Sequence, residues 1–372
     1  MAVSDPKTGK NRIGILTFHN TLNYGASLQC YALQTHLLDA GYDVKVLDYQ
    51  NEKFKKEYSP FYMPNRSLRK FAYMLAAFPT NVGKRRRKKV FDKKNLMRSA
   101  PYDKTDMKDA NKNFDCIIVG SDQVWNYNLT NSDFTYLLDF AAPALKKISY
   151  AASFGLSSID EAHARVYLPL LRDFSHLSVR EEQGKSLLQN MGVETEAKVV
   201  IDPVFLLSRE KWLSLLAPPK RKGYIALYMF RNRAALEYAK QLSRSTGKKL
   251  VYIGAPIKSF EKCKKVRRIG PFDWLSLIAH ADYVVTDSFH GTAFAVLMQK
   301  KFVSFRDVDG GMKADSRLET LLGKIGLEHR LLSRQTDVDL IDQEIDQEDV
   351  SRRLTALINE SKQFLKDALS AE

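Results

Sequence analysis

The sequence predicts an α/β protein in which two Rossmann-like domains face each other across a cleft. At 372 residues the chain is too long for one typical hydrophobic core and suits two domains. From residue 12 onward, short apolar runs alternate with helical patterns, which is the element order of a doubly wound parallel sheet. A turn-rich, charged segment at 218–223 interrupts this alternation, and a second series follows it. We therefore expect a first domain over residues 1–217 and a second domain over residues 218–372.

The first domain opens with a buried strand at 12–18, a polar loop at 19–24 and a helix at 25–39. The same patterns predict strands at 44–49, 115–119, 147–151 and 177–179, helices at 161–174 and 181–191, and a short apolar run at 199–206. Residues 51–109 interrupt this order because they are lysine-rich, with a helical pattern at 68–78. We expect them to form a basic insertion of two helices.

The second domain repeats the alternation. The patterns predict strands at 224–230, 249–253, 282–286 and 302–305, and helices at 234–246, 272–280, 291–299 and 318–325. An amphipathic helix at 346–369 follows, and we expect it to cross back to the first domain. Two such domains facing each other make the architecture called GT-B, in which ligands lie at the carboxyl ends of the strands. The fold alone does not determine the chemistry.

Composition excludes several classes of protein. No window approaches 18 uninterrupted apolar residues and residues 1–12 are polar, so we expect a cytoplasmic protein without a membrane span or signal peptide. The three cysteines, Cys30, Cys116 and Cys263, are far apart and form no C-x-x-C motif, which disfavours a disulfide framework and a zinc site. No cluster has metal-ligand spacing, so we expect no bound metal.

The net charge is positive and unevenly distributed. The chain has 58 Lys and Arg against 43 Asp and Glu, a balance of +15, with a basic block at Lys84–Lys89 and an acidic stretch at 337–349. Such a block is compatible with a solvated helix face, an anionic membrane surface or a polyphosphate substrate. Nucleic acid is disfavoured because no recognition module accompanies the block. If the substrate is lipid-linked, the block is expected to hold the protein on the inner face of the membrane or to grip a diphosphate.

The most informative segment is Asp-Ser-Phe-His-Gly at 287–291. It lies between an apolar run and a helical run, so it predicts a strand, a tight turn and a helix start. Backbone N–H groups at a helix start can hold an anion, and His290 would lie beside it as the one titratable ring. We assign Ser288, His290, Gly291 and Thr292 to this anion site. The alternative is a helix cap made by Asp287 or Ser288, with His290 simply packed.

The segment 120–126, Gly-Ser-Asp-Gln-Val-Trp-Asn, again follows a buried strand. We assign Ser121, Asp122, Gln123, Trp125 and Asn126 to a saccharide site, because an indole can stack on a sugar and a carboxylate can accept a hydroxyl proton. The alternative places Trp125 in the interior and gives Asp122 a capping role.

Two shorter segments add polar groups at strand ends. The loop at 19–26 offers Asn20, Asn23 and Tyr24 for sugar hydroxyls or a phosphate, although an Asn-capped helix start explains it equally well. Arg180 stands between a strand and a helix, where its guanidinium could bind a carboxylate or phosphate with two parallel hydrogen bonds. The alternative for Arg180 is a surface pair with a neighbouring glutamate.

Taken in order, these segments resemble one family. The N-Y-G-A start of the first helix, G-S-D-Q-V-W-N, S-V-R-E, the run Val200-Ile201-Asp202-Pro203-Val204 and D-S-F-H-G-T-A-F-A-V-L are similar to the polysaccharide pyruvyl transferases. The resemblance implies a GT-B-like fold and transfer of a pyruvyl group from phosphoenolpyruvate to a saccharide as a ketal, in bacterial exopolysaccharide, capsule or cell-envelope glycan synthesis. Several members carry an arginine two residues before the histidine, where this chain has Ser288. A different cationic side chain must therefore bind phosphoenolpyruvate.

This chemistry assigns roles to the candidate residues. Phosphoenolpyruvate is the co-substrate, Arg180 and the helix start at His290 bind it, and no redox cofactor is needed. His290 is the candidate general acid or base and Asp122 the second one. We place the saccharide acceptor, possibly lipid- or nucleotide-linked, on the first domain and the donor on the second. The alternatives are a GT-B glycosyltransferase that uses a nucleotide sugar, and a non-catalytic glycan-binding protein of envelope assembly.

Overall fold

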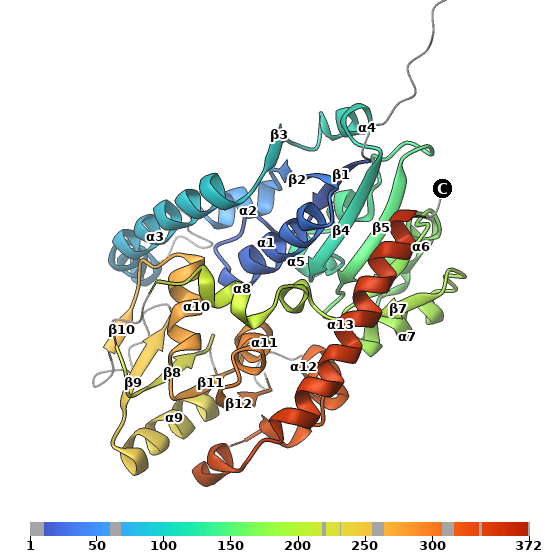
Figure 1. Ribbon diagram of the computed structural model, residues 1–372. Helices are drawn as coiled ribbons and strands as arrows, with labels where there is room; N and C mark the ends of the chain where they lie inside the picture. The colour runs from blue at the N-terminus through green and yellow to red at the C-terminus, as the bar shows by residue number, and fades with distance from the viewer. Residues whose placement is uncertain are drawn as a thin grey trace, which may run out of the picture.

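The structure is a computed structural model that describes residues 11–59, 68–217, 221–230, 232–254, 264–306, 316–334 and 337–370, with the backbone alone at 68–77. Within these residues the chain forms two parallel sheets of seven and six strands, each flanked by helices (Figure 1). The predicted α/β fold of two Rossmann-like domains is therefore confirmed. The predicted linker at 218–223 lies partly outside the described residues, and the domain boundary stays a prediction.

The first sheet has the strand order β3-β2-β1-β4-β5-β6-β7. Its strands are β1 (Arg12–Leu16), β2 (Asp43–Tyr49), β3 (Arg98–Tyr102), β4 (Cys116–Asp122), β5 (Lys146–Ala152), β6 (Leu177–Val179) and β7 (Ala197–Val199). The helices of this half are α1 (Tyr24–Asp39), α2 (Glu52–Glu57), α3 (Leu68–Asn95), α4 (Ala110–Asn113), α5 (Tyr127–Thr130), α6 (Glu161–Arg172), α7 (Glu182–Asn190) and α8 (Arg209–Ser214). The central strands are almost wholly buried, as expected of a parallel sheet with helices on both faces.

The second sheet has the strand order β10-β9-β8-β11-β12-β13. Its strands are β8 (Tyr224–Tyr228), β9 (Lys249–Ile253), β10 (Lys264–Val266), β11 (Tyr283–Thr286), β12 (Lys301–Phe305) and β13 (Leu331–Leu332). The helices are α9 (Arg233–Thr246), α10 (Pro271–Ala279), α11 (Phe289–Leu297), α12 (Ser316–Lys324) and α13 (Gln347–Ser370).

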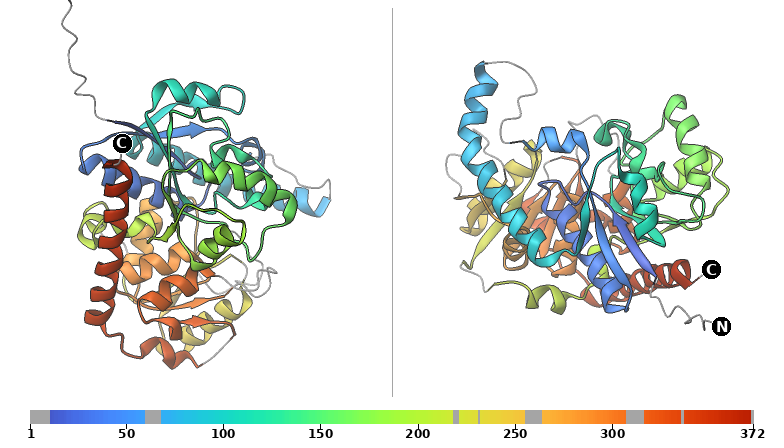
Figure 2. Two further views of the ribbon diagram at one scale, coloured as in Figure 1. Left: turned by 90° about the vertical axis from the view of Figure 1, so that its right-hand side faces the viewer. Right: turned by 90° about the horizontal axis from the view of Figure 1, so that it is seen from above.

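Helix α13 connects the two halves. It starts beside the second sheet and runs along one side of the molecule to the first (Figures 1 and 2). Near its far end, Ser361 Oγ accepts a hydrogen bond of 2.9 Å from Ile201 N, and the ring of Phe364 packs against Tyr150 of β5. The predicted crossing of the C-terminal helix is thus confirmed.

Helix α1 packs between the first sheet and the helices of the second half. Its start is fixed by Asn23, whose side chain accepts from Gly25 N and Ala26 N. Most of the helix is buried rather than amphipathic, because the first sheet covers one side and α10 and α11 of the second half cover the other. The N-terminus of α1 is therefore held between the two domains.

One prediction about the elements is wrong. The insertion at 51–109 is not purely helical, because β3 pairs with β2 and forms the edge of the first sheet. The apolar run at 199–206 ends in the 3₁₀ helix η3 (Pro203–Leu206), which Pro203 starts at its first position.

The expectations from composition concern membrane-spanning helices, metal ligands and cysteines. No helix in the described ranges is long and apolar enough to span a bilayer. The same residues contain no group of three or more His, Cys, Asp or Glu placed to hold a metal. Burial raises the pKa of Cys30 and Cys116 to about 12, and Cys263 lies outside the described residues.

Candidate active site

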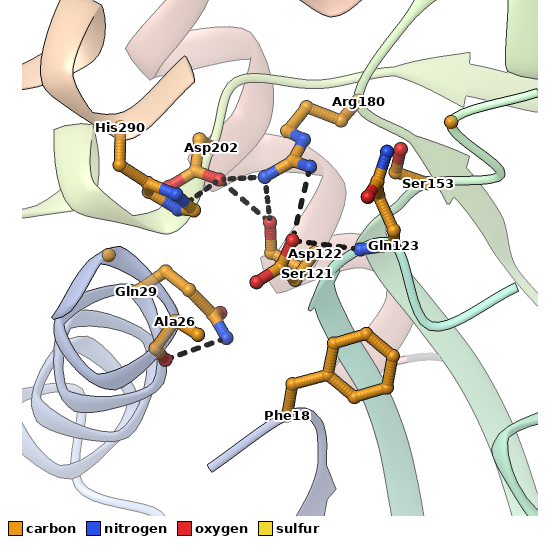
Figure 3. Close-up of polar contacts among 12 residues, drawn as sticks. Phe18, Ala26, Gln29, Ser121, Asp122, Gln123, Ser153, Arg180, Asp202 and His290 are labelled. Carbon is orange, nitrogen blue, oxygen red and sulfur yellow. Dashed lines mark hydrogen bonds and ion pairs between the residues drawn. The ribbon is translucent and has the colours of Figure 1, made fainter. Parts of the chain in front are cut away.

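A buried ionic cluster lies where the ends of β4 and β6 meet the segment leading into η3 (Figure 3). Arg180, directly after β6, places Nη1 2.8 Å from Asp202 Oδ2 and donates to Ser121 Oγ at 3.3 Å. Ser121 Oγ in turn donates to Asp202 Oδ2 at 2.8 Å. All three side chains are shielded from solvent, so their charges interact more strongly than they would at the surface.

Asp202 is the anion at the centre of this cluster. Burial alone would raise its pKa, but the electrostatic interaction with His290 and the charge and hydrogen bond of Arg180 hold the pKa well below its usual range. Its other oxygen, Oδ1, caps η3 by accepting from Val204 N at 3.1 Å. Asp202 therefore stays ionised and fixed in place.

His290 reaches the same carboxylate from the second domain. It stands in the first turn of α11, which Ser288 caps through a 3.4 Å hydrogen bond from Gly291 N. Its Nε2 lies 3.6 Å from Asp202 Oδ2, longer than a hydrogen bond. The ring packs directly on Gly25 of α1, where an added Cβ would lie only 2.2 Å from His290 Cγ. The N-termini of α1 and α11 thus converge on this imidazole.

Asp122 ends β4 with a strained backbone. Its φ of 77° lies in the left-handed region, which only Gly, Asn and Asp adopt with any ease. The side chain accepts from Gln123 N at 2.9 Å and places Oδ1 3.6 Å from Arg180 Nη2. Such strain is found most often at functional sites.

Several buried polar atoms around this cluster have no hydrogen-bond partner within the described part of the chain. They are Arg180 Nε and Nη2, His290 Nε2, Gln29 Oε1, Gln123 Nε2 and Glu181 Oε2. Folded proteins leave few such atoms without a partner, because each one carries an uncompensated desolvation cost. Figure 3 shows Gln29 on α1 and Gln123 beyond β4 on either side of the cluster. These atoms supply hydrogen-bonding capacity for a polar, anionic ligand.

The structure brings together four residues predicted from three separate segments, namely Ser121, Asp122, Arg180 and His290. Gln123 is adjacent, with its amide against Gly155. Gly291 and Thr292 lie in the same turn as His290, but the Thr292 hydroxyl is buried and engaged with Ser288 O and Ser304 Oγ.

Other predicted saccharide residues serve the fold. Trp125 is fully buried, donates from Nε1 to Tyr136 O at 3.0 Å and packs on Phe154 and Phe174, so the predicted stacking on a sugar is wrong. Asn126 caps α5 by accepting from Asn128 N and Leu129 N. The interior and capping alternatives thus describe both residues.

The predicted binding residues in and after the loop before α1 also contact other parts of the protein. Asn23 is the α1 cap, and Asn20 donates to Tyr49 O at 2.7 Å. Tyr24 stacks on Trp274 with ring centroids 5.8 Å apart, and the ammonium of Lys84 lies 4.3 Å from its centroid. Tyr24 directly precedes Gly25, the residue of α1 that contacts His290.

Sequence reasoning missed three residues near the cluster. Asp202 was seen only as part of the Asp-Pro-Val run, although an Asp before Pro is a recognisable start of a helical turn. Glu181 is buried rather than paired at the surface, so the surface-pair alternative for Arg180 is wrong. Its Oε1 accepts from Ser153 Oγ at 2.8 Å and Phe154 N at 3.1 Å, and burial raises its pKa. Gln29 carried no sequence signal.

The basic block is not uniformly solvated. Lys88 is buried, pairs with Asp92 and donates to His19 O at 2.6 Å, which ties α3 to the loop after β1. Lys84 is turned toward Tyr24. Arg86, Arg87 and Lys89 remain exposed. The block therefore has an inward and an outward side.

Comparison with known proteins supports the fold and assigns a family. Residues 23–307 match the family model described as polysaccharide pyruvyl transferase. No significant match was found among curated proteins. Similar solved structures include the UDP-GlcNAc 2-epimerase from Neisseria meningitidis bound to UDP-GlcNAc (TM-score 0.52, 14% identity, covering 96% of this chain and 99% of that one). AviGT4, a glycosyltransferase of avilamycin A biosynthesis, has a TM-score of 0.53 at 10% identity, with 97% and 99% covered. At these identities the likeness concerns the fold alone. This chain therefore has a GT-B-type fold and belongs to the polysaccharide pyruvyl transferase family.

Proposed function

We propose that this chain transfers a pyruvyl group from phosphoenolpyruvate to a saccharide, forming a ketal. The observation that carries the proposal is the buried guanidinium of Arg180. It is held by Asp202 and lies 4.3 Å from the ring centroid of Phe289, yet its Nε and Nη2 have no hydrogen-bond partner in the described structure. A guanidinium fork matches a carboxylate or a phosphate, and phosphoenolpyruvate carries both. Arg180 is thus our candidate for the cation that Ser288 does not provide.

The reaction requires that a carbon atom of phosphoenolpyruvate be protonated. One proton adds to the methylene carbon of phosphoenolpyruvate, two acceptor hydroxyl oxygens bond to C2, and the C2–O bond to phosphate breaks. The two hydroxyls release two protons, of which one balances the proton placed on carbon and the other leaves with the phosphate. A side chain that gives and receives protons near neutral pH is therefore needed.

We assign this role to His290. Its Nε2 has no hydrogen-bond partner in the described structure and lies 3.6 Å from the carboxylate of Asp202. Asp122 is our candidate to accept a proton from an acceptor hydroxyl, with its charge balanced by Arg180 at 3.6 Å. Gln123 and Gln29 could orient the acceptor through their free amide atoms.

The proposal is tested by phosphate release from phosphoenolpyruvate in the presence of a panel of saccharides. We expect release that depends on an added saccharide, with a pyruvyl ketal in the product. A glycosyltransferase of the same fold would instead be protected against thermal unfolding by UDP or GDP and not by phosphoenolpyruvate. A glycan-binding protein would be protected by the saccharide and would turn over neither donor.

A further inference from the structure

A second cationic site lies between the domains, on the outward side of α3. A hollow of about 530 Å³ is lined by Gly83, Arg86, Arg87 and Val90 of α3 and by Arg268, which precedes α10. We call it the arginine hollow. Figure 1 shows α3 alongside β10 and α10 at this edge of the molecule. Because its cations come from both halves of the chain, the arginine hollow is not simply the surface of one basic helix.

The backbone places Arg268 in the hollow. Its φ of 60° is left-handed, which is unfavourable for an arginine. Its side chain rests on Gly83, where an added Cβ would lie 2.7 Å from Arg268 Cγ. On the other side, Arg87 Cβ is 3.7 Å from the Cβ position of Gly270. Because Gly83 has no side chain, Arg268 of the second domain can pack against α3 beside Arg86 and Arg87.

Among the described residues, no acidic side chain neutralises the charge of the arginine hollow. None of its lining residues is acidic, and Arg86, Arg87 and Arg268 make no ion pair with any described residue. Elsewhere on the surface, cations of exposed helices do pair within one turn, as Lys56 does with Glu52. Like charges gathered without counter-charges repel one another, so an anion would stabilise this arrangement.

A single residue of α3, Lys84, connects the segment that lines the hollow with the start of α1. Lys84 follows Gly83 directly and turns its ammonium toward Tyr24, at the start of α1. The next residue, Gly25, contacts His290. Burial lowers the pKa of Lys84 to about 8. Lys84 is therefore a cation on the path from the arginine hollow, through the start of α1, to His290.

We propose that the arginine hollow binds the phosphate or diphosphate through which the acceptor saccharide is carried, while the sugar reaches His290. The proposal rests on the proposed function for the role of the ligand. It makes the substrate a phosphate-linked saccharide and not a free glycan. A nucleotide sugar and a lipid-linked sugar share this chemistry.

The test measures binding of inorganic pyrophosphate to the full chain by calorimetry. Changing Arg86, Arg87 and Arg268 together to Gln should raise the Kd about 10-fold to 100-fold, the scale of lost charge-assisted hydrogen bonds. The matched control changes Arg221, Arg244 and Arg334 to Gln, which removes the same charge outside the hollow, and should leave the Kd within about twofold. Equal affinity in the wild type and the hollow variant, or an equal loss in the control, would overturn the proposal.

Two further probes identify the carrier. Tighter arginine-dependent binding of geranyl diphosphate than of UDP supports a lipid carrier, and the reverse supports a nucleotide; either result supports a diphosphate site. If the hollow variant loses only binding to phosphatidylglycerol vesicles and keeps pyrophosphate affinity, the surface is a membrane contact and the proposal is wrong. Because no turnover is measured, failure of phosphoenolpyruvate as donor would not affect these results.

Discussion

Among the described residues, two clusters each combine a buried histidine and aspartate with an arginine, which is buried at position 180 and exposed at position 98. The first, which we call the closed cluster, consists of His19, Asp48 and Arg98 at the ends of β1 and β2 and in β3. His19 Nε2 lies 3.0 Å from Asp48 Oδ1, and Nδ1 lies 3.2 Å from Thr17 O. Asp48 also accepts from Arg98 at 2.9 Å and from Gln50 at 2.5 Å. Both ring nitrogens of His19 and both carboxylate oxygens of Asp48 thus have partners.

The second, which we call the open cluster, consists of Arg180, Asp202 and His290. Its carboxylate is satisfied, but His290 Nε2 and two nitrogens of Arg180 have no hydrogen-bond partner within the described residues. The closed cluster joins elements of one domain, whereas the open cluster spans both. Buried charge and a histidine–aspartate pair are therefore not enough to indicate a ligand site. What separates the two clusters is unused hydrogen-bonding capacity, and the following changes test that distinction.

The largest effect is expected for His290→Ala in the open cluster. Turnover should fall by a factor on the order of 10² or more, the scale of a lost general acid, while the protein stays folded. Phosphate release and circular dichroism measure the two quantities. His280→Ala, at the end of α10 in the same domain, serves as the control. Near wild-type turnover in folded His290→Ala would remove this residue from the mechanism.

A smaller loss is expected for Gly25→Ala. An added Cβ would overlap the His290 ring, so the imidazole must shift, and a displacement of about 1 Å can reduce kcat/KM up to about 10²-fold. Gly323→Ala in α12 is the matched control, because its Cβ would have no neighbour closer than 3.9 Å. Equal activity of the two variants would show that the contact between α1 and His290 does not position the ring.

In the closed cluster the effect should appear in stability. His19→Ala removes a partner of buried Asp48 and should lower the free energy of unfolding by about 2–3 kcal/mol. The control is the half-exposed pair of His163 and Asp160, whose side chains lie 2.7 Å apart. His163→Ala should lower the free energy of unfolding by less than about 1 kcal/mol. Urea denaturation measures both. If His19→Ala left stability unchanged and abolished phosphoenolpyruvate binding, the two clusters would have been assigned the wrong way round.

The smallest effect is expected for Glu181→Gln, and it concerns how stability depends on pH. The pKa of Glu181 is raised because the carboxyl is buried. A raised carboxyl pKa means that the folded state holds its proton to higher pH than the unfolded state. Stability should therefore fall as pH rises above the ordinary Glu pKa of about 4.3 and through the folded-state pKa. Glu181→Gln should weaken this pH dependence, as measured by thermal unfolding between pH 4 and pH 8. An unaltered profile would show that Glu181 does not cause it.

The sequence predicted most of the fold because central parallel strands are continuous apolar runs and the long helices have clear patterns. The strand β3 was missed since Arg98–Tyr102 is a short edge strand that contains Pro101 and buries only Tyr102. The strands β7, β10 and β13 have two or three residues, too few for any periodicity.

Most of the candidate site could be predicted because the expected sheet topology brings separate segments together. Ser121 and Asp122 end β4 and Arg180 follows β6, and these are strands of one parallel sheet whose carboxyl ends lie at the same edge. Asp202 was not assigned a role because its place depends on how the chain returns past β7, which no local pattern encodes. Trp125 lies in a promising segment, but a sequence does not show which side of a turn faces the core.

The central claim is that the open cluster binds phosphoenolpyruvate through Arg180. The most direct measurement is calorimetric titration of phosphoenolpyruvate into the wild type, Arg180→Lys and Arg98→Lys, the last altering the matching arginine of the closed cluster. A lysine ammonium lacks the guanidinium fork, so Arg180→Lys should raise the Kd about tenfold or more, and Arg98→Lys should leave it unchanged. Equal affinities in all three proteins, or no binding by the wild type, would contradict the account.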